Sequence, residues 1–538
     1  MSHNNTDYEK VYAEFRYDAK HTFNFAVDVI DRWAEKKPEK PAIQWIDDNG
    51  LKKTRTFSDI RNHSLSIASA LYKSGLRQND IIMVMLGRDI EWWEILTASI
   101  RLGLVFIPIS DKLTHKDLEY RLNSSEAACF VTNSENAGKF ELIDHMCPYV
   151  RVRCLTDEKT EDWLSIGEMI SDYPPEGAFP NGKPEESSII YFTSGTGGLP
   201  KMASHSLPSY SLSHYVTGKY WLNLSENDTV WHIGDTGWAK STWSAYFGPW
   251  HMGATVFVHN SSRFDPEKTL EILSEYPVTT LCTTPTAYRM MADVDLERYS
   301  FKGLKHLVAA GEPLNSEVAG CWLEKKGLVI HNGYGQTETS LLCGMFKGME
   351  SPKGSMGKPA PGVVLDIIDP SGNIMPVNEE GEIAVKIAPV KPPGIFNGYV
   401  NENGAYDIVY KKDYFLTGDR ARKDENGFLW FIGRTDDVIV TSGYRISPFE
   451  VETALDSHNA VLESAVVACH DEIRGEIVKA FVVLSPGHSG TMDLEKELQD
   501  HVQKKVAAYK YPRKIEFIDS LPKSMSGKIK REVLRHMD

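Results

Sequence analysis

The sequence predicts an α/β protein that carries a mostly β subdomain and ends in a small α+β domain. The first observation is an alternation, from about residue 24 onward, of helical patterns with short apolar runs such as 81–86. The second is a change at about 355–400, where proline and glycine become frequent. The third is a separate group of helix and strand patterns that starts near residue 437.

Individual strands follow from these patterns. The apolar runs 254–258 and 306–310 end beside glycine or polar residues, as strands do at the ligand crevice of an open sheet. The short β-like runs 364–368 and 382–387 predict a β-rich subdomain at about 355–433.

The last unit mixes both kinds of element. We expect a helix at about 448–455 and strands at 464–468 and 478–484. The predicted organisation is therefore an N-terminal domain of residues 1–435 and a C-terminal domain of residues 436–538.

Size and charge limit the possible functions. A chain of 538 residues is long enough for several structural units. Its 41% hydrophobic and 25% charged residues are ordinary for a globular protein with a large core. The formal net charge of −15 argues against a nucleic-acid partner and against a polybasic membrane patch.

Cysteines and apolar runs bear on the location of the protein. The seven cysteines form no C-x-x-C pair, so neither a disulfide framework nor a zinc site is expected. No apolar run approaches the ~20 residues that span a bilayer, and the first ten residues lack the features of a secretory signal. We therefore expect a cytoplasmic protein without a membrane span, and a homodimer and a monomer both stay open.

A glycine-rich segment follows the apolar run 189–192, which is typical of a buried strand. Three glycines let the backbone approach a polyanion, while hydroxyls and a lysine add donors and charge. No Gly-Lys-Ser/Thr closes the loop, so it is not a Walker A motif. We interpret it as a phosphate-binding loop, with a polar surface turn as the alternative. Its residues are Thr193, Ser194, Gly195, Thr196, Gly197, Gly198, Leu199, Pro200 and Lys201.

A second polar cluster lies at 332–339 and combines an aromatic ring, glycines, hydroxyls and a carboxylate. Tyr334 could stack on a purine, and Thr337 could donate to a phosphate or carboxylate oxygen. Glu338 is the kind of hard oxygen ligand that Mg²⁺ prefers. The alternative is a helix start that is capped by Asn332 or Thr337.

Three further segments carry single candidate residues. The aromatic run 414–417 ends at a glycine turn and Asp419, which could accept both ribose hydroxyls or merely cap a turn. The segment 431–446 lies at the expected domain boundary, where glycine and aspartate also suit a linker. Lys528 lies on a Ser/Gly-rich turn near the C-terminus, where a solvated lysine is the alternative.

Taken together and in this order, the motifs resemble the adenylate-forming superfamily of acyl-CoA synthetases, firefly luciferases and peptide-synthetase adenylation domains. The shared set is T-S-G-T-G-G-L-P-K, Y-G-Q-T-E, T-G-D, G-R-T-D-D and S-G-K. Segments 234–238, 394–399, 474–482 and 509–517 are similar to the medium-chain acyl-CoA synthetases. Gly197 departs from the superfamily, which usually has threonine or serine there; one hydroxyl is lost, and the backbone donors remain.

The resemblance implies a fold and a reaction. The expected N-terminal domain has two α/β subdomains and a distorted β-barrel, and the small C-terminal domain turns about Asp436. ATP and a carboxylic acid would form an acyl-adenylate and pyrophosphate, and CoA would then give acyl-CoA and AMP. Because two anions meet in the first step, fixed positive charge and oriented dipoles must favour its transition state. Mg²⁺ is the implied cofactor and CoA the co-substrate.

The resemblance also implies residue roles. Lys528 would bridge the substrate carboxylate and the α-phosphate, Thr337 would lie between the α-phosphate and the acyl group, and Glu338 would bind Mg²⁺. The loop 193–201 would hold the β- and γ-phosphates. The other implied ATP- and AMP-binding residues are Gly311, Glu312, Pro313, Asn332, Gly333, Tyr334, Gly335, Gln336, Thr337, Asp419, Arg434 and Lys528.

In the second step the domain turn would withdraw Lys528 and open the path of the pantetheine thiol. The implied CoA-binding residues are Ser442, Gly443, Tyr444, Arg445 and Arg474. The family also has a basic CoA contact in the helix before Tyr509. Gln503 stands there in this chain, and Lys504 and Lys505 are the candidate replacements.

The resemblance assigns Trp238, Lys240, Cys282 and Gly335 to the acyl site. An inward Lys240 would have to be neutral, paired or placed at a wet end of the tunnel. An outward, solvated Lys240 is the alternative, because lysine is almost never fully buried unless it is paired. Each buried CH₂ contributes only ~0.8 kcal/mol, so sharp chain-length selection would need a steric stop.

The leading hypothesis is an AMP-forming acyl-CoA synthetase for medium-chain acids, including branched or alicyclic ones. A benzoate-type aryl-CoA ligase is the nearest alternative, and transfer to a carrier protein is another. A ligand-binding pseudoenzyme would be expected to lack Lys528, Glu338 or Asp419, and all three are present.

Overall fold

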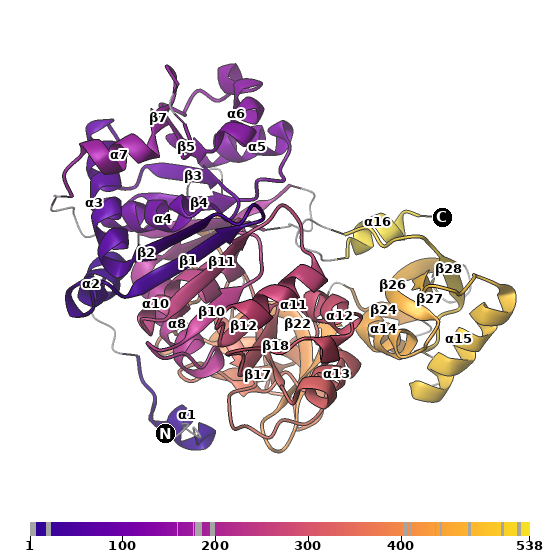
Figure 1. Ribbon diagram of the computed structural model, residues 1–538. Coiled ribbons are helices and arrows are strands. Elements are labelled where there is room, and N and C mark those ends of the chain that lie inside the picture. The colour runs from indigo at the N-terminus through magenta and orange to yellow at the C-terminus, as the bar shows by residue number, and fades with distance from the viewer. Residues whose placement is uncertain are drawn as a thin grey trace.

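The computed structural model describes residues 7–17, 23–158, 160–175, 177, 186–193, 199–401, 404, 406–408, 410–435, 437–441, 444–471, 475–506, 510–523 and 529–537. Four β-sheets form the framework of this part of the chain. Figure 1 shows the two large sheets with their helices, the strands around β17 and β22 below them, and the C-terminal unit to one side.

The first large sheet has the strand order β20-β19-β9-β8-β4-β3-β5-β6-β7 among the described residues. Its central strands are parallel, apolar and covered on both faces, as expected for strands joined by crossover helices. Its strands are β3 (Ile81–Met85), β4 (Val105–Ile109), β5 (Cys129–Thr132), β6 (Val152–Leu155), β7 (Leu164–Ser165), β8 (Ser187–Thr193), β9 (Lys201–Ser206), β19 (Gly398–Val400) and β20 (Tyr406–Asp407). Its helices are α3 (Phe57–Lys73), α4 (Glu91–Leu102), α5 (His115–Ser125), α6 (Ser134–Glu141), the short 3₁₀ segment Asp144–Met146 and α7 (Ile166–Asp172).

The second large sheet has the order β16-β15-β14-β13-β12-β10-β11-β1-β2. Its strands are β1 (Pro41–Asp47), β2 (Lys52–Thr56), β10 (Thr229–His232), β11 (Thr255–Asn260), β12 (Thr280–Thr283), β13 (His306–Ala310), β14 (Ile330–Gly335), β15 (Leu341–Gly344) and β16 (Lys358–Pro359). The helices near it are α1 (Tyr8–Glu14), α2 (Arg32–Lys36), α8 (Leu207–Val216), α9 (Ala239–Thr242), α10 (Gly248–His251), α11 (Pro266–Glu275), α12 (Pro285–Ala292) and α13 (Ser316–Lys326). Shorter helical segments are Ala26–Asp31, Thr217–Trp221, Trp243–Phe247 and Leu296–Arg298.

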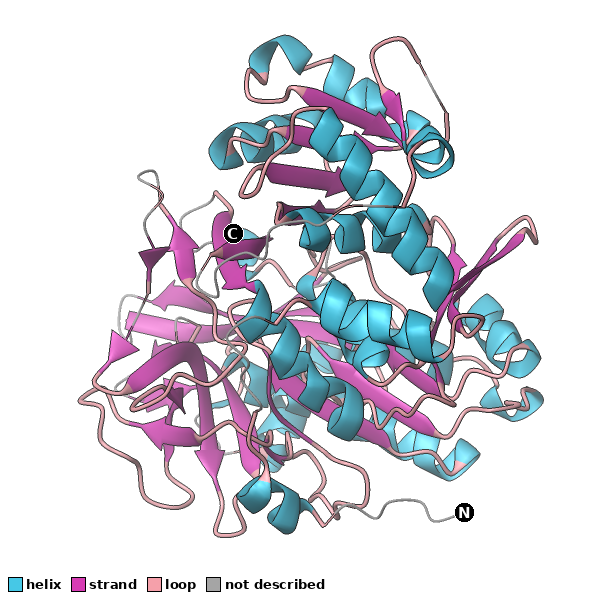
Figure 2. Ribbon diagram, turned by 90° about the vertical axis from the view of Figure 1, so that its left-hand side faces the viewer, coloured by secondary structure: helices cyan, strands magenta, loops and turns pink. Residues whose placement is uncertain are grey.

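One hydrophobic core fills the space between the two large sheets. It joins Phe106 of β4, Val256 of β11 and Trp92 of α4, and Trp92 meets both Phe106 and Tyr246 edge-on. Figure 2 shows helices running through the middle of the molecule between the sheets. Separate cores lie under α5 and α6 on one outer face and under α11, α12 and α13 on the other. The predicted α/β architecture is confirmed by this layering.

The β-rich subdomain is a third sheet with the path β17-β18-β22-β21, and β23 pairs with β22. Its strands are β17 (Leu365–Ile368), β18 (Glu380–Lys386), β21 (Tyr410–Lys411), β22 (Tyr414–Lys423) and β23 (Leu429–Arg434). The prediction of a β-rich subdomain is confirmed, and its closure into a barrel stays a prediction.

The prediction that the aromatic run 414–417 ends at a glycine turn is wrong. Gly418 takes a φ of 70° inside β22, and alternating buried residues continue the strand through Asp419.

The C-terminal unit has its own core and the sheet order β25-β24-β27-β26, with β28 beside β27. Its strands are β24 (Ile439–Thr441), β25 (Tyr444–Ile446), β26 (Val461–Asp471), β27 (Gly475–Leu484) and β28 (Lys514–Phe517), and its helices are α14 (Pro448–Asp456), α15 (Met492–Lys505) and α16 (Arg531–Arg535). Arg289 of α12 donates to the Leu462 carbonyl at 3.3 Å and connects this unit to the second sheet. None of the helices in the described ranges is long and apolar enough to cross a membrane.

Candidate functional site

The candidate site lies where parallel strands β13 and β14 end, which is the edge at which open α/β sheets bind ligands. Segment 311–313 follows β13, and segment 332–335 forms the end of β14. The register pairs Ala310 with Gly333, so the two predicted nucleotide segments lie beside each other. The third sheet brings β22 to the same place, because Tyr334 contacts Asp419.

Asp419 collects the polar groups of this edge. Its Oδ2 accepts hydrogen bonds from the Tyr334 hydroxyl at 2.7 Å and from Gln336 Nε2 at 2.5 Å. Arg434 Nη1 lies 3.5 Å from Oδ1. Only 5% of Asp419 is exposed, so a polar network replaces its hydration. Burial, and then the negative charge of Asp419, raises the pKa of Tyr334, which therefore remains a donor.

The helix-start alternative for 332–339 is wrong. Residues up to Gly335 belong to β14, which pairs with β13 on one side and β15 on the other. The following turn is closed by Thr339, whose Oγ1 accepts from the Gln336 amide at 3.0 Å. The backbone of this segment therefore finds its hydrogen-bond partners in the neighbouring strands and not within a helix.

Thr337 is held by a residue that the sequence reasoning missed. His205 of β9 donates from Nε2 to the Thr337 carbonyl at 2.7 Å. Burial lowers the pKa of His205 to about 3, so the ring is neutral and Nε2 must carry its single proton. A lone histidine in a strand carries no sequence signal for this contact.

Glu338 follows Thr337 in the turn after β14 and contacts Tyr399 of β19. Its Oε1 accepts from the Tyr399 hydroxyl at 2.5 Å, and no hydrogen bond to Oε2 is found among the described residues. Lys201 Nζ lies 5.1 Å from the centroid of the Tyr399 ring. The sequence marks Tyr399 only as the last residue of segment 394–399. The described residues form no group of three or more metal-ligating side chains.

The predicted phosphate loop joins the two antiparallel strands β8 and β9. Thr193 of β8 pairs with Lys201 of β9, and the Tyr120 hydroxyl of α5 donates to the Pro200 carbonyl at 3.1 Å. Leu199 is 64% exposed. Five loop residues lie outside the described ranges: Ser194, Gly195, Thr196, Gly197 and Gly198.

The predicted adenine segments show why glycine occurs in them. Gly311 has a φ of 100°, a left-handed conformation that favours glycine. At Gly333 a Cβ atom would lie 2.5 Å from the Trp221 ring. Glu312 turns away toward α12, where its Oε2 accepts from the Thr286 hydroxyl at 2.6 Å. Asn332 accepts from Trp221 through its carbonyl.

The outward alternative for Lys240 is wrong. Its Nζ donates to the carbonyls of Thr283 and Ala310, both at 2.7 Å, at the ends of β12 and β13. Burial lowers the pKa of Lys240, against smaller opposing effects of Cys282 and Glu312. The strand-end carbonyls give the ammonium the partners that burial requires.

Lys240 thereby lies close to Cys282, another acyl-site candidate. Cys282 is buried next to Thr283 on β12. Trp238 precedes α9, and its buried Nε1 has no hydrogen-bond partner within the described ranges. A Cβ atom at Gly335 would come within 2.3 Å of the Ser340 carbonyl, so only glycine fits there.

Lys528, Asp436, Ser442, Gly443 and Arg474 lie outside the described residues. The backbone of Tyr444 and Arg445 forms part of β25, and Gln503, Lys504 and Lys505 end α15.

The chain just beyond Lys528 lies near the first large sheet. Burial raises the pKa of Asp117 in α5, but hydrogen bonds from Thr114 and the positive charges of Arg121 and Lys530 lower it overall. Lys530 is thus close enough to α5 to act on Asp117, and α5 also carries the Tyr120 contact to Pro200.

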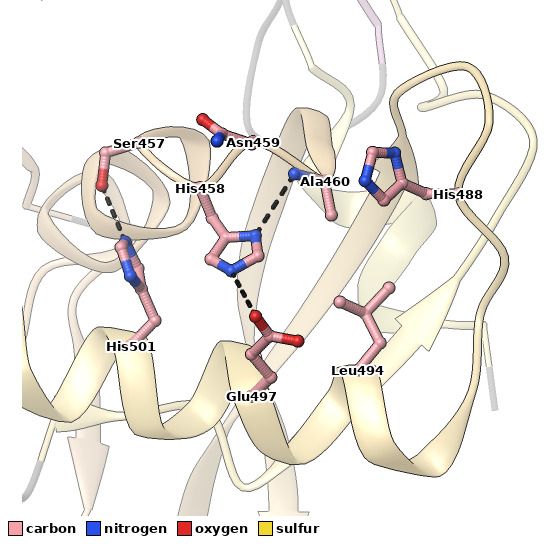
Figure 3. Close-up of a pocket in the computed structure, with 8 residues that line it drawn as sticks. All are labelled: Ser457, His458, Asn459, Ala460, His488, Leu494, Glu497 and His501. Carbon is pink, nitrogen blue, oxygen red and sulfur yellow. Dashed lines mark hydrogen bonds and ion pairs between the residues drawn. The ribbon is translucent and has the colours of Figure 1, made fainter.

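A separate cavity of about 330 Å³ lies in the C-terminal unit. Figure 3 shows His458 between α14 and α15, where it donates to Glu497 at 3.3 Å and accepts from the Ala460 amide at 3.2 Å. His488 and His501 also line it. None of the predicted site residues lines this cavity.

Two family models match the chain. The model of the AMP-binding enzymes matches residues 30–400, and that of the AMP-binding enzyme C-terminal domain matches residues 450–528. The chain is 44% identical to acyl-coenzyme A synthetase ACSM3, mitochondrial, of Homo sapiens, over 99% of this chain and 92% of that protein. It is 45% identical to the human mitochondrial acyl-coenzyme A synthetase ACSM4, over 96% of this chain and 90% of that protein.

Solved structures agree with the fold. An acyl-CoA synthetase of Brucella canis is 32% identical with a TM-score of 0.74 and covers 98% of this chain and 97% of its own. The anthranilate CoA ligase AuaEII, in complex with anthranoyl-AMP, is 27% identical with a TM-score of 0.87 and covers 96% and 98%.

The comparisons correct one expectation and establish the family. The cytoplasmic location predicted from the sequence is contradicted by relatives named as mitochondrial. Both family models and full-length identity of 44% support a single assignment. The chain belongs to the AMP-binding enzyme family and, within it, to the acyl-coenzyme A synthetases.

Proposed function

We propose that the protein is an AMP-forming acyl-CoA synthetase that joins a medium-chain, branched or alicyclic carboxylic acid to CoA. ATP and the acid form an acyl-adenylate with release of pyrophosphate, and the CoA thiol then displaces AMP. The observation that carries the proposal is the convergence of Tyr334, Gln336 and Asp419 at the strand ends, beside Glu338 and Lys201.

In the first step, Asp419 would accept the ribose hydroxyls, with Tyr334 and Gln336 holding its carboxylate. Thr337, anchored by His205, would face the α-phosphate and the acyl group. Lys528 would neutralise the two anions that meet there. Mg²⁺ fits Glu338, because this carboxylate has an oxygen without a hydrogen-bond partner in the described part and Mg²⁺ often takes one carboxylate plus substrate phosphates. When bound, Mg²⁺ would neutralise charge on the phosphates.

For the second step we propose that the chain divides into domains 1–435 and 436–538 and that the smaller one turns about Asp436. The turn would replace Lys528 with the segment 442–445 at the same site, as lids and domains do in other enzymes. Arg445 and Arg474 would then bind CoA. The separate core of the C-terminal unit supports this division.

A panel of acids tests the proposal. It should run from butyrate to dodecanoate and include isovalerate, cyclohexanecarboxylate and benzoate, with pyrophosphate release measured with and without CoA. We expect the highest kcat/KM with a medium-chain, branched or alicyclic acid, and thioester only when CoA is present. Pyrophosphate release without any thioester would contradict a CoA ligase. A preference for benzoate would favour the aryl-CoA ligase alternative. Benzoate is included because the chain is similar to an anthranilate CoA ligase.

A further inference from the structure

Tyr399 contacts two of the proposed nucleotide-binding residues at once. Its hydroxyl donates to Glu338 Oε1 at 2.5 Å, and the Lys201 ammonium lies 5.1 Å from its ring centroid. Burial, and then the charge of Glu338, raises the pKa of Tyr399. The phenol therefore stays protonated near neutral pH and keeps its role as donor.

The backbone around Tyr399 is tied to both sides of the site. In β19, Tyr399 pairs with Ala203 of β9, the strand that begins at Lys201. The Phe396 amide donates to the Glu338 carbonyl at 3.0 Å, and the Asn397 amide donates to the Ser204 carbonyl at 2.6 Å. The ring of Tyr399 is thus held at a fixed place between the end of the phosphate loop and the turn that carries Glu338.

We propose that Tyr399 is a positioning residue for the adenylation step. It holds Glu338 through one carboxylate oxygen, so that the second oxygen is oriented to take Mg²⁺ with ATP, and its ring face attracts the Lys201 ammonium. The inference rests on the proposed function and names a residue that the motifs did not assign. A flexible glutamate that is already oriented loses less side-chain entropy when it binds a ligand.

The hydroxyl contact is tested with Tyr399→Phe, which keeps the ring. Mg²⁺-dependent binding of a non-hydrolysable ATP analogue is measured by calorimetry without acid, and the Mg²⁺ dependence of pyrophosphate release is measured separately. We expect about tenfold more Mg²⁺ to be needed in both, as for the loss of a hydrogen bond to a charged group. Thioester formation from supplied acyl-adenylate and CoA should stay within about twofold, because no Mg²⁺·ATP enters it.

Tyr414→Phe is the matched control. The substitution removes the 2.8 Å hydrogen bond that the Tyr414 hydroxyl donates to the Asp366 carboxylate in the third sheet. This contact involves neither Glu338 nor Lys201. The control should leave the Mg²⁺ dependence unchanged. An equal shift in Tyr414→Phe, or an equal loss of both half-reactions in Tyr399→Phe, would show a structural role and overturn the proposal. An unchanged Mg²⁺ dependence in Tyr399→Phe would overturn it as well.

Tyr399→Leu separates the two contacts, because it removes the ring under Lys201 in addition to the hydroxyl. We expect a further rise of about two- to fivefold in the ATP concentration for half-maximal rate, in line with the strength of an exposed cation–π contact. Equal ATP requirements in the Phe and Leu variants would exclude the role toward Lys201. If wild-type protein released no pyrophosphate with any acid of the panel, the proposed function would fail, whereas ATP binding would still report on Tyr399.

Discussion

The hydroxyl of Tyr334 donates a 2.7 Å hydrogen bond to the carboxylate of Asp419, which lies 85 residues further along the chain. The contact joins the second large sheet to the third sheet. Gln336 adds a second donor to the same oxygen, so Asp419 is both a link between subdomains and the proposed ribose ligand.

Replacing Asp419 with alanine should therefore have two effects. The Tyr334 hydroxyl and one of the two side-chain N–H groups of Gln336 would lose their acceptor, and the free energy of unfolding should fall by about 1–3 kcal/mol. The ATP concentration for half-maximal pyrophosphate release should rise by about tenfold or more. Asp366→Ala, which removes the acceptor of Tyr414, is the control and should lower stability without changing the ATP requirement. If Asp366→Ala raised the ATP requirement as much as Asp419→Ala does, the assignment of Asp419 as the ribose ligand would be contradicted.

The Lys528→Ala variant should separate the two half-reactions. The variant lacks the positive charge that Lys528 is proposed to place beside the α-phosphate. Adenylate formation should therefore slow by about 100-fold or more, as it does when other transition-state contacts are lost. Thioester formation from supplied acyl-adenylate should be spared. Lys523, five positions earlier in the sequence, forms an ion pair with Glu463, and Lys523→Ala should leave both steps nearly unchanged. Equal loss of both steps in Lys528→Ala would argue against domain alternation.

Lys240→Met should change the response to chain length. The substitution removes the ammonium that donates to the carbonyls of Thr283 and Ala310, so the free energy of unfolding should fall by about 1–3 kcal/mol. An apolar side chain should raise kcat/KM for the longer acids, by up to about fourfold for each added CH₂ that becomes buried. The competition of paired acids measures this ratio directly.

Lys423→Met is the control for Lys240→Met, because Lys423 also donates to a backbone carbonyl, that of Leu365 in the third sheet. Its acid profile should match that of the wild type. A Lys240→Met protein with an unaltered profile would place Lys240 outside the acyl site.

Buried histidines should make the fold sensitive to acid. Burial lowers the pKa of His205 and His306 to about 3 and that of His251 to about 4, against an ordinary value of 6.5. Their full contribution is present above pH 6.5 and is lost as the pH falls toward those values, because the unfolded chain then binds more protons. The slope reaches about 1.4 kcal/mol per pH unit for each histidine.

Four carboxyl groups act in the opposite direction. Burial raises the pKa of Glu91 and of Asp456 to about 7, and it also raises the pKa of Asp89 and of Asp111. Their contribution is therefore largest in acid and declines as the pH rises toward their raised pKa values. Burial also lowers the pKa of His214 and His232, so these five histidines outnumber the four carboxyl groups. We expect the Tm to fall between pH 7 and pH 5 in thermal denaturation at constant ionic strength. A constant or rising Tm over this range would contradict the prediction.

Local patterns were sufficient to predict many elements of the fold. The apolar run 306–310 became β13 with the same bounds, and the helix expected at 448–455 became α14 (Pro448–Asp456). Burial of a strand or of one helix face imposes a short-range periodicity that the sequence must carry. The prediction at 414–419 was wrong, because a single glycine can adopt a left-handed φ within a strand that continues.

Residue types and their order along the chain also determined the family and the candidate chemistry: a glycine-rich loop, Glu338, Asp419 and Lys528 are visible without coordinates. Only the tertiary structure decided which groups meet. The contacts of His205 with Thr337, of Tyr399 with Glu338 and of Lys240 with two strand-end carbonyls join residues that are far apart in the chain. Such contacts depend on strand pairing and sheet packing, which place side chains in space and leave no periodic or local signal in the sequence.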